Sequence, residues 1–297
     1  MIIIVVCGLI WAGSDFQFCL AGQSRARLSG IPFVMFRVEN EAARGAADIC
    51  AAAWQERGLE FTSALLPAGA MTDTIHCLVM GTERFRANFS GRLPDWGVGV
   101  ALPPGRLIAL DHTRLPAIGK GVKEVFLHEM VHALLFQACA EVYLPVWFHE
   151  GTAMLFSGEW KFKDTVSLAL DGRVPRLGRL VGPFPSTAAG ADRAYLTSLL
   201  AVNRLRDRHG QDVVLRLVET TARVGDFEAA FYEVTGQSLE EFSLGFDRAM
   251  NLRFGWLVML TRWPALFVLM GLVFAVGAVR KIIQTRRRLA EMEDEVD

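Results

Sequence analysis

The chain has 297 residues, of which 52% are hydrophobic, so it can bury a sizeable core and is not a disordered protein. Its 31 basic and 32 acidic residues give a formal net charge of -1, and without a positive field we expect no binding to nucleic acid. The mean hydropathy of +0.29 is high for a soluble protein, which indicates that part of the apolar sequence faces lipid.

The N-terminal segment is apolar over residues 1–12 and continues into Leu-Ala-Gly at 20–22, which suits a cleavage zone. This pattern predicts that residues 1–24 form a signal peptide or another N-terminal hydrophobic segment. No basic residue precedes the apolar run, while Arg25 and Arg27 follow it, so an uncleaved anchor or a mis-assigned start explains the pattern equally well. A buried N-terminal strand is the remaining alternative, because the run is short.

Residues 31–253 are expected to form one mixed domain in which strands come first and helices follow. The predicted strands lie near 33–38, 74–80, 98–102 and 107–110, and the predicted helices lie near 41–57, 82–89, 122–138, 147–157, 192–209, 211–222, 225–235 and 238–253. Turn residues at 103–105, between two apolar runs, predict a hairpin. This order predicts an α+β fold with a small mixed or antiparallel sheet followed by a helical half that carries the candidate site described below.

Five cysteines are present, and two of them, Cys7 and Cys19, lie in the N-terminal segment. The other three are Cys50, Cys77 and Cys139. An exported domain would lie in an oxidising compartment, which permits a bridge between Cys50 and Cys77. Three buried free thiols that pack as small apolar residues are the equal alternative.

An apolar helical run from Val125 to Leu135 contains the pattern His-Glu-X-X-His at 128–132. Residues four apart lie on one face of a helix, so His128 and His132 can bind the same ion. Glu129 lies about 100° round the helix from the first His, so it can act on a water at the ion without binding the ion. The pattern therefore predicts a catalytic zinc site with these two His ligands and Glu129 as the general base.

A catalytic zinc ion needs a third protein ligand. A third His six residues after the second, with a Gly between them, would indicate a metzincin, but Leu135 and Ala138 occupy those positions, so that family is excluded. Downstream, the segment 145–154 predicts the start of a second helix that carries His149 and Glu150. Both a carboxylate and an imidazole bind zinc, so either residue can serve chemically.

The two segments together resemble the gluzincin zinc metallopeptidases, in particular the peptidase MA-like domain family. In that family the second zinc helix opens with an aromatic residue, a Glu, a Gly and a nearby Ala, all of which occur within 148–153. The resemblance covers about 33–250 and implies that Glu150 is the third ligand of one Zn²⁺ ion, with His149 as its neighbour. Family members often carry an acidic residue one turn after this ligand, where Ala153 and Met154 stand here, so the residue that orients the His ligands is not identified.

Two further features follow from the resemblance. The segment 96–110 resembles the edge-strand region upstream of the zinc helix, where an exposed strand can pair with an extended peptide. The candidate substrate-binding residues there are Val98, Val100, Ile108 and Leu110, and an ordinary hairpin without a substrate role is the alternative. The segment 194–198 resembles a family segment that brings a Tyr toward the site, so Tyr195 is a candidate hydrogen-bond donor to the oxyanion, with a structural buried Tyr as the alternative.

The expected activity is hydrolysis of a peptide or protein substrate by a zinc-activated water, with Glu129 as the general base. One rival is an intramembrane metalloprotease, because 170–172 mimics the distal aspartate motif of that class. Charged neighbours such as Lys163 and Arg173 would be very unfavourable in lipid and argue against it. Another rival is a membrane-tethered, non-catalytic zinc module that binds peptides or serves assembly, although a purely structural zinc site needs no general base.

The C-terminal segment from Trp256 to Val279 is almost entirely apolar. Its 24 residues would extend ~36 Å as a helix, against a hydrocarbon core of about 30 Å, so it is predicted to cross a membrane once and to contact lipid. A buried core helix is the alternative. Because Arg280, Lys281 and further basic residues follow, we expect 280–297 to be a cytoplasmic tail and the domain to lie on the periplasmic or extracellular side.

Overall fold

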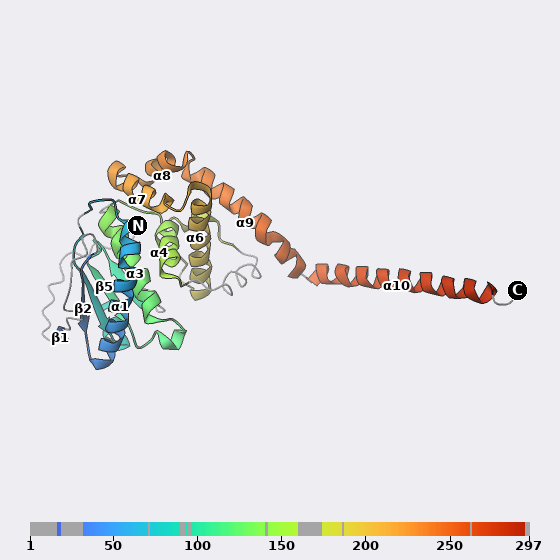
Figure 1. Cartoon of the computed structure of the whole chain (residues 1–297), viewed down its shortest axis with the longest axis horizontal. Coiled ribbons are helices and arrows are strands. Elements are labelled where there is room, and N and C mark those ends of the chain that lie inside the picture. Colours follow the sequence, from blue (N-terminus) through green and yellow to red (C-terminus); the bar gives the residue numbers. More distant parts are fainter. Residues whose placement is uncertain are drawn as a thin grey trace. The chain divides into compact units, whose positions relative to one another are not determined.

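The computed structural model describes residues 17–18, 32–70, 72–89, 93, 97–139, 142–159, 174–185, 187–261 and 263–294 (Figure 1). The chain divides into two compact units, the first formed by Met1–Lys161 and Pro175–Phe246 and the second by Phe162–Val174 and Asp247–Asp297. Most of the predicted domain 31–253 thus belongs to the first unit. The predicted N-terminal segment 1–24, except for two residues, and the aspartate motif at 170–172 lie outside the described residues.

The first unit contains a mixed sheet in the order β1-β2-β3-β5-β4. Its strands are β1 (Gln17–Phe18), β2 (Val34–Val38), β3 (Ile75–Met80), β4 (Gly99–Leu102) and β5 (Leu107–Asp111). Strands β2, β3 and β5 are parallel, whereas β4 is antiparallel to β5 and β1 is antiparallel to β2. The hairpin predicted at 103–105 is confirmed, and Gly105 has a φ of 87°, which only glycine adopts readily. Strand β4 therefore forms one edge of the sheet.

The predicted helices all occur, and most of their ends shift by only a few residues. They are α1 (Glu41–Leu65), α2 (Thr82–Phe89), α3 (Val122–Cys139), α4 (Val146–Ser157), α6 (Ala188–His209), α7 (Val213–Val224), α8 (Phe227–Thr235) and α9 (Leu239–Thr261). Helix α1 extends to Leu65 rather than ending at Arg57. Gly58 is buried inside it, and Phe61 continues its buried face, so packing outweighs the weak helix propensity of glycine.

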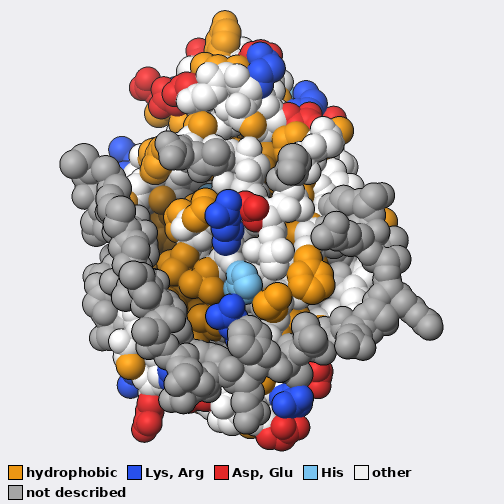
Figure 2. Space-filling model, turned by 90° about the vertical axis from the view of Figure 1, so that its left-hand side faces the viewer, with side chains coloured by type: hydrophobic (Ala, Val, Ile, Leu, Met, Phe, Trp, Pro, Cys, Tyr) orange, Lys and Arg blue, Asp and Glu red, His pale blue; other side chains and the backbone are white. Residues whose placement is uncertain are grey.

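The sheet is covered on both faces, as the alternation of its side chains requires. On one face, Phe36 packs against Phe126 of α3 with ring centroids 5.7 Å apart. On the other face, the residues that pack against one another are Leu78, Met80, Val100 and Ala109 from the strands and Phe85 and Phe89 from α2. Figure 2 looks onto the sheet side of the molecule, where hydrophobic side chains gather near the centre of the view. The two faces of the sheet thus pack against two parts of one hydrophobic core.

Helix α3 is the central element of the first unit (Figure 1). It contacts α1, β4 and β5 on the side of the sheet and α4 and α7 on the side of the helices. Every residue from Val125 to Leu135 is buried, so this helix has no solvated polar stripe. The ionisable residues His128, Glu129 and His132 are therefore held inside a packed core, where their side chains have little freedom to move.

The three cysteines of the domain, Cys50, Cys77 and Cys139, are buried and free, so the bridge considered between Cys50 and Cys77 is not formed. Burial raises the pKa of Cys139 to about 12 and also raises the pKa values of the other two thiols. All three therefore stay protonated at neutral pH and pack as small apolar side chains.

The C-terminal helix α10 (Trp263–Asp294) belongs to the second unit. Among the described residues, one helical segment is long and apolar enough to cross a membrane, Phe267–Arg286, with a mean hydropathy of 1.8 and none of its apolar window buried. The sequence predicts one helix over 256–279, whereas α9 ends at Thr261 and α10 begins two residues later. Arg262, which lies between them, is outside the described residues.

Candidate metal centre

Helices α3 and α4 bring the three predicted metal ligands together. His128 and His132 lie one turn apart on α3, and Glu150 lies in the second turn of α4. The Oε2 atom of Glu150 lies 3.3 Å from Nε2 of His128 and 3.3 Å from Nε2 of His132. The candidate ligand atoms of the three residues all lie within 4.8 Å of one another. One ion can therefore contact all three side chains.

Burial and mutual charge set the protonation of this cluster. Burial lowers the pKa of His128, but the carboxylates of Glu159 and Glu150 outweigh that effect and raise the pKa to about 10. Burial would raise the pKa of Glu150, but His132 and His128 outweigh it and hold that pKa well below its ordinary value. Without a metal the cluster thus pairs an imidazolium with carboxylates, and a bound divalent cation would replace the imidazolium proton.

His149 lies beside the cluster but belongs to an aromatic stack. Its ring lies 4.5 Å from the ring of His132 at an interplanar angle of 21°, and 4.8 Å from the ring of Phe136. Burial and the neighbouring His132 lower the pKa of His149 to about 3, so its ring is neutral. Its ligand atoms are not among those that converge with the other two His residues. Of the two candidates for the third ligand, the geometry therefore favours Glu150.

Glu129 lies against the edge strand β4. A Cβ atom built on Gly99 would lie 2.7 Å from Oε1 of Glu129 and 2.9 Å from Cγ1 of Val125, so the strand can approach α3 this closely only because residue 99 has no side chain. Burial raises the pKa of Glu129, while His132 and His128 lower it to a smaller extent. The carboxylate is thus held between the imidazole pair and the edge of the sheet, without being one of the three converging ligands.

Tyr195 comes from α6 and lies next to the cluster, as the sequence predicts. Its ring centroid lies 6.4 Å from that of His128 and 5.2 Å from that of Phe184. Burial and the nearby carboxylates, Glu150 first among them, raise the pKa of Tyr195 well above its ordinary value. The phenol therefore stays protonated and keeps an O–H group that can donate a hydrogen bond.

The four predicted substrate-binding residues differ in their position relative to the sheet edge. Strand β5 lies between β3 and β4, so its backbone is paired on both sides, and Ile108 and Leu110 do not belong to an edge. These two residues are therefore not on an edge strand, and their contact with substrate stays a prediction. Val98 and Val100 do lie at the β4 edge, but their side chains are only 6% and 9% exposed, and Val100 packs in the core. At the β4 edge, main-chain atoms rather than these two side chains are therefore available for contact with a substrate.

Glu159 is a site residue that the sequence analysis did not identify. Its Oε2 atom lies 3.5 Å from Nδ1 of His128 and 3.7 Å from Nζ of Lys120. The acidic neighbour of the ligands thus lies beyond the end of α4, not one turn after Glu150. A signal for it exists in the sequence, because Gly158 marks the end of a helix and Glu159 is the first acidic residue after Glu150.

The donor atoms of the cluster suit a transition-metal ion. Two imidazole nitrogens and one carboxylate oxygen are a common ligand set for zinc with one open position, although other divalent ions also bind such sets. Both Nε2 atoms face Glu150, which leaves each Nδ1 atom on the far side of its ring. Both Nδ1 atoms are buried and have no hydrogen-bond partner among the described residues. The residues therefore fit a metal bound on the Nε2 side.

Comparison with known proteins adds little to this geometry. No family model matches the chain. The chain is similar to the uncharacterized protein YhcO of Bacillus subtilis (strain 168), with 28% identity over 134 residues. The similarity covers 42% of this chain and 40% of YhcO, so the chain matches less than half the length of that relative. These comparisons assign no activity to the chain.

Proposed function

We propose that the chain is a zinc-dependent metallopeptidase of the gluzincin type that hydrolyses peptide bonds in peptide or protein substrates. The observation that carries this proposal is the convergence of His128, His132 and Glu150 beside a buried carboxyl side chain, Glu129, that is not one of the three. A structural metal site needs no such carboxylate, whereas hydrolysis needs a base beside the attacking water.

The chemistry divides between the ion and the protein. Zinc held by the three ligands would lower the pKa of a water toward about 7 and polarise the scissile carbonyl. Glu129 takes a proton from that water as its oxygen attacks the carbonyl carbon, and it gives the proton to the amine nitrogen as the C–N bond breaks. The raised pKa of Glu129 supports the second half of this role, because a more basic carboxylate holds the proton until the amine leaves.

Two further parts of the site have roles in this proposal. Tyr195 donates its O–H to the oxygen that becomes negatively charged when the carbonyl is attacked. The outer edge of β4, to which no other described strand is paired, binds the main chain of an extended substrate, which would run past Gly99 and so past Glu129. Recognition through main-chain atoms gives little selectivity for substrate side chains at these positions.

We also propose that the chain is a single-pass membrane protein with its catalytic unit outside the cytoplasm. The segment Phe267–Arg286 supports a membrane span, and the basic residues at its C-terminal end and just beyond it, from Arg280 to Arg288, support a cytoplasmic position for that end. External protease added to intact right-side-out cells or vesicles should digest the catalytic unit and leave an epitope on the tail intact. Protection of the catalytic unit in sealed vesicles would contradict this orientation.

The enzymatic proposal is tested with the full chain in detergent, stripped of metal and reloaded with Zn²⁺. We expect one zinc per chain and cleavage of a peptide library by the wild type. Glu129→Gln should keep the zinc and lose hydrolysis, because an amide does not accept the water proton. His128→Ala should lose both. The matched control is Glu124→Gln on the same helix, which makes the same chemical change outside the cluster and should leave zinc and hydrolysis unchanged.

Three results would contradict the proposal. One is a wild-type chain that retains no transition metal after reloading. Another is full hydrolysis by Glu129→Gln. The third is a zinc-loaded wild type that binds peptides but cuts none, even with enzyme in excess over substrate, which would identify a binding or assembly module instead.

A further inference from the structure

An acidic residue, Glu159, lies on the Nδ1 side of the His128 ring, opposite the Nε2 atom that would bind the metal. Its Nε2 faces Glu150, so Nε2 can bind a metal only when the ring proton lies on Nδ1. The Oε2 atom of Glu159 lies 3.5 Å from that Nδ1, a distance for an ion pair rather than for an aligned hydrogen bond. The side chain of Glu159 is only 13% exposed. Its carboxylate therefore lies on the Nδ1 side of the His128 ring and has little contact with solvent.

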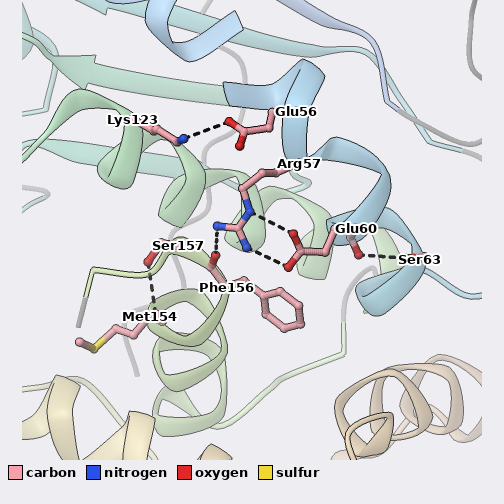
Figure 3. Close-up of polar contacts among 8 residues, drawn as sticks. All are labelled: Glu56, Arg57, Glu60, Ser63, Lys123, Met154, Phe156 and Ser157. Atoms are coloured by element: carbon pink, nitrogen blue, oxygen red, sulfur yellow. Dashed lines mark hydrogen bonds and ion pairs between the residues drawn. The ribbon is translucent and has the colours of Figure 1, made fainter. Parts of the chain in front are cut away.

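The end of α4 is held in place from α1, which sets where Glu159 lies. Nη1 of Arg57 donates to the carbonyl oxygen of Phe156 at 2.9 Å, while Nε and Nη2 donate to the carboxylate of Glu60 (Figure 3). This bidentate pair fixes the plane of the guanidinium group. Gly158 then turns the chain with a φ of 73°, a conformation that favours glycine. Glu159 thus follows a turn whose preceding residue Phe156 is held by the hydrogen bond from Arg57.

A second contact holds the carboxylate from the other side. Lys120, in the turn that precedes α3, places its Nζ 3.7 Å from Oε2 of Glu159. The same oxygen therefore lies between a lysine ammonium and the imidazole of His128. A carboxylate in this position stabilises the ring proton on Nδ1 electrostatically and so leaves the lone pair on Nε2, which is the tautomer that a metal requires.

The other imidazole ligand is held differently. The Nδ1 atoms of both His residues are buried without a hydrogen-bond partner among the described residues, but only that of His128 has a carboxylate at ion-pair distance there. The ring of His132 instead stacks on His149, which in turn packs against Phe136. Stacking restrains the plane of a ring but does not select which nitrogen carries the proton. Of the two His ligands, only His128 thus has a carboxylate that can select its tautomer in the described part of the site.

We propose that Glu159 is the positioning residue that orients His128 for metal binding, with Lys120 holding its carboxylate in place. The proposal rests on the proposed zinc site. Glu159 follows the C-terminal cap of α4. In this proposal it orients a His ligand, as an acidic residue one turn after the third ligand would otherwise do.

The test compares the full chain carrying Glu159→Ala or Glu159→Gln with the wild type. Zn²⁺ affinity is measured by competition with a chromophoric chelator, and the visible spectrum is recorded with Co²⁺ in place of zinc. Glu159→Ala should weaken zinc binding by about 10–100-fold and shift the cobalt bands. Glu159→Gln should lose less, because its amide oxygen keeps a partial negative charge beside Nδ1 and can accept a hydrogen bond from it. Neither variant should change the melting temperature in the presence of EDTA by more than a few degrees.

The matched control is Glu56→Ala. Glu56 also pairs with a lysine, Lys123, at 3.1 Å on the neighbouring surface, but it does not contact a ligand (Figure 3). Its zinc affinity and cobalt spectrum should match those of the wild type. Equal losses in Glu56→Ala and Glu159→Ala would show a general charge effect and overturn the proposal.

The remaining outcomes separate this proposal from the proposed function. Wild-type affinity and a wild-type cobalt spectrum in Glu159→Ala would overturn the role of Glu159 and leave the metallopeptidase proposal intact. A wild type that binds zinc but cuts no peptide would overturn the activity, while the affinity loss in the variants would still support the positioning role. A wild type without zinc affinity would overturn both.

Discussion

Replacing Gly151 by Ala should force α4 away from α6. A Cβ atom at this position would lie 2.3 Å from the carbonyl oxygen of Ser198 and 2.7 Å from Cγ2 of Val202. Ordinary contacts begin at 3.4 Å, so the two helices would have to separate by about 1.1 Å, the difference between 3.4 and 2.3 Å. Because the nearest atom belongs to the backbone, no side-chain rotation can relieve the clash.

The expected cost follows from two opposing terms. Overpacking of a core contact costs about 1–3 kcal/mol, while the higher helix propensity of Ala returns about 1 kcal/mol. We expect a net loss of up to about 2 kcal/mol in the free energy of unfolding, which lowers the melting temperature by up to about 8 °C for a domain of this size. Zinc affinity should fall as well, because Glu150 precedes Gly151 and metal sites tolerate distance changes of only about 0.2 Å.

Thermal unfolding with and without EDTA, together with a zinc competition titration, measures both effects. Gly45→Ala on α1 is the control, since a Cβ atom there would meet nothing within 4 Å. It should raise the free energy of unfolding by about 0.5–1 kcal/mol, because Ala stabilises a helix relative to Gly. If Gly151→Ala melted like the wild type and bound zinc equally well, the inferred closeness of α4 and α6 would be wrong.

Three further predictions concern the strand edge, protonation and a helix cap. Gly99→Ala should displace the Glu129 carboxylate and reduce hydrolysis by at least about tenfold with zinc still bound, and unchanged kcat would argue against that contact. Because the pKa of His128 is raised to about 10, zinc binding below that pH should release its proton, and zinc affinity should rise about tenfold per pH unit between about pH 7 and 9. Calorimetry in buffers of different ionisation enthalpy counts the protons, and none released near pH 8 would refute this. Asn40→Ala, which removes the 2.9 Å hydrogen bond from the amide of Ala43, should cost about 1 kcal/mol in urea unfolding, and an unchanged midpoint would show that the cap contributes nothing.

The positions of helices and strands are predictable here because their signals are local. The apolar period changes at Val122, and the turn at 103–105 separates two apolar runs, so both features can be read from neighbouring residues. Strand pairing is less local. The parallel pairing of β2 with β3 follows from the long helix α1 between them, since parallel strands need a crossover connection. The interior place of β5, which removes Ile108 and Leu110 from the edge, depends on its pairing with β3 and has no local signal.

The candidate site divides in the same way. His128, Glu129 and His132 share one helical turn, so their common position follows from helix geometry alone. Glu150 required a family resemblance, because only the packing of α4 on α3 shows which residue of the second helix reaches the His pair. Gly99 could not be assigned from the sequence, since it acts through a contact with a residue distant along the chain. Glu159 has a local signal in Gly158, but its contact with His128 follows only from the fold.

The composition of α3 gives an independent reason to regard the cluster as functional. Burying ionisable groups costs several kcal/mol unless they are paired, and a helix that is otherwise apolar would be more stable with apolar residues at those positions. Here the cost is offset by the partly buried carboxylates of Glu150 and Glu159, which come from a different segment and whose charge contributes nothing to an apolar core. Such a local conflict with stability is expected where function, and not folding, determines the residue. The pairing among these residues satisfies the charges, but a bound cation between the two Nε2 atoms and the carboxylate would satisfy them better.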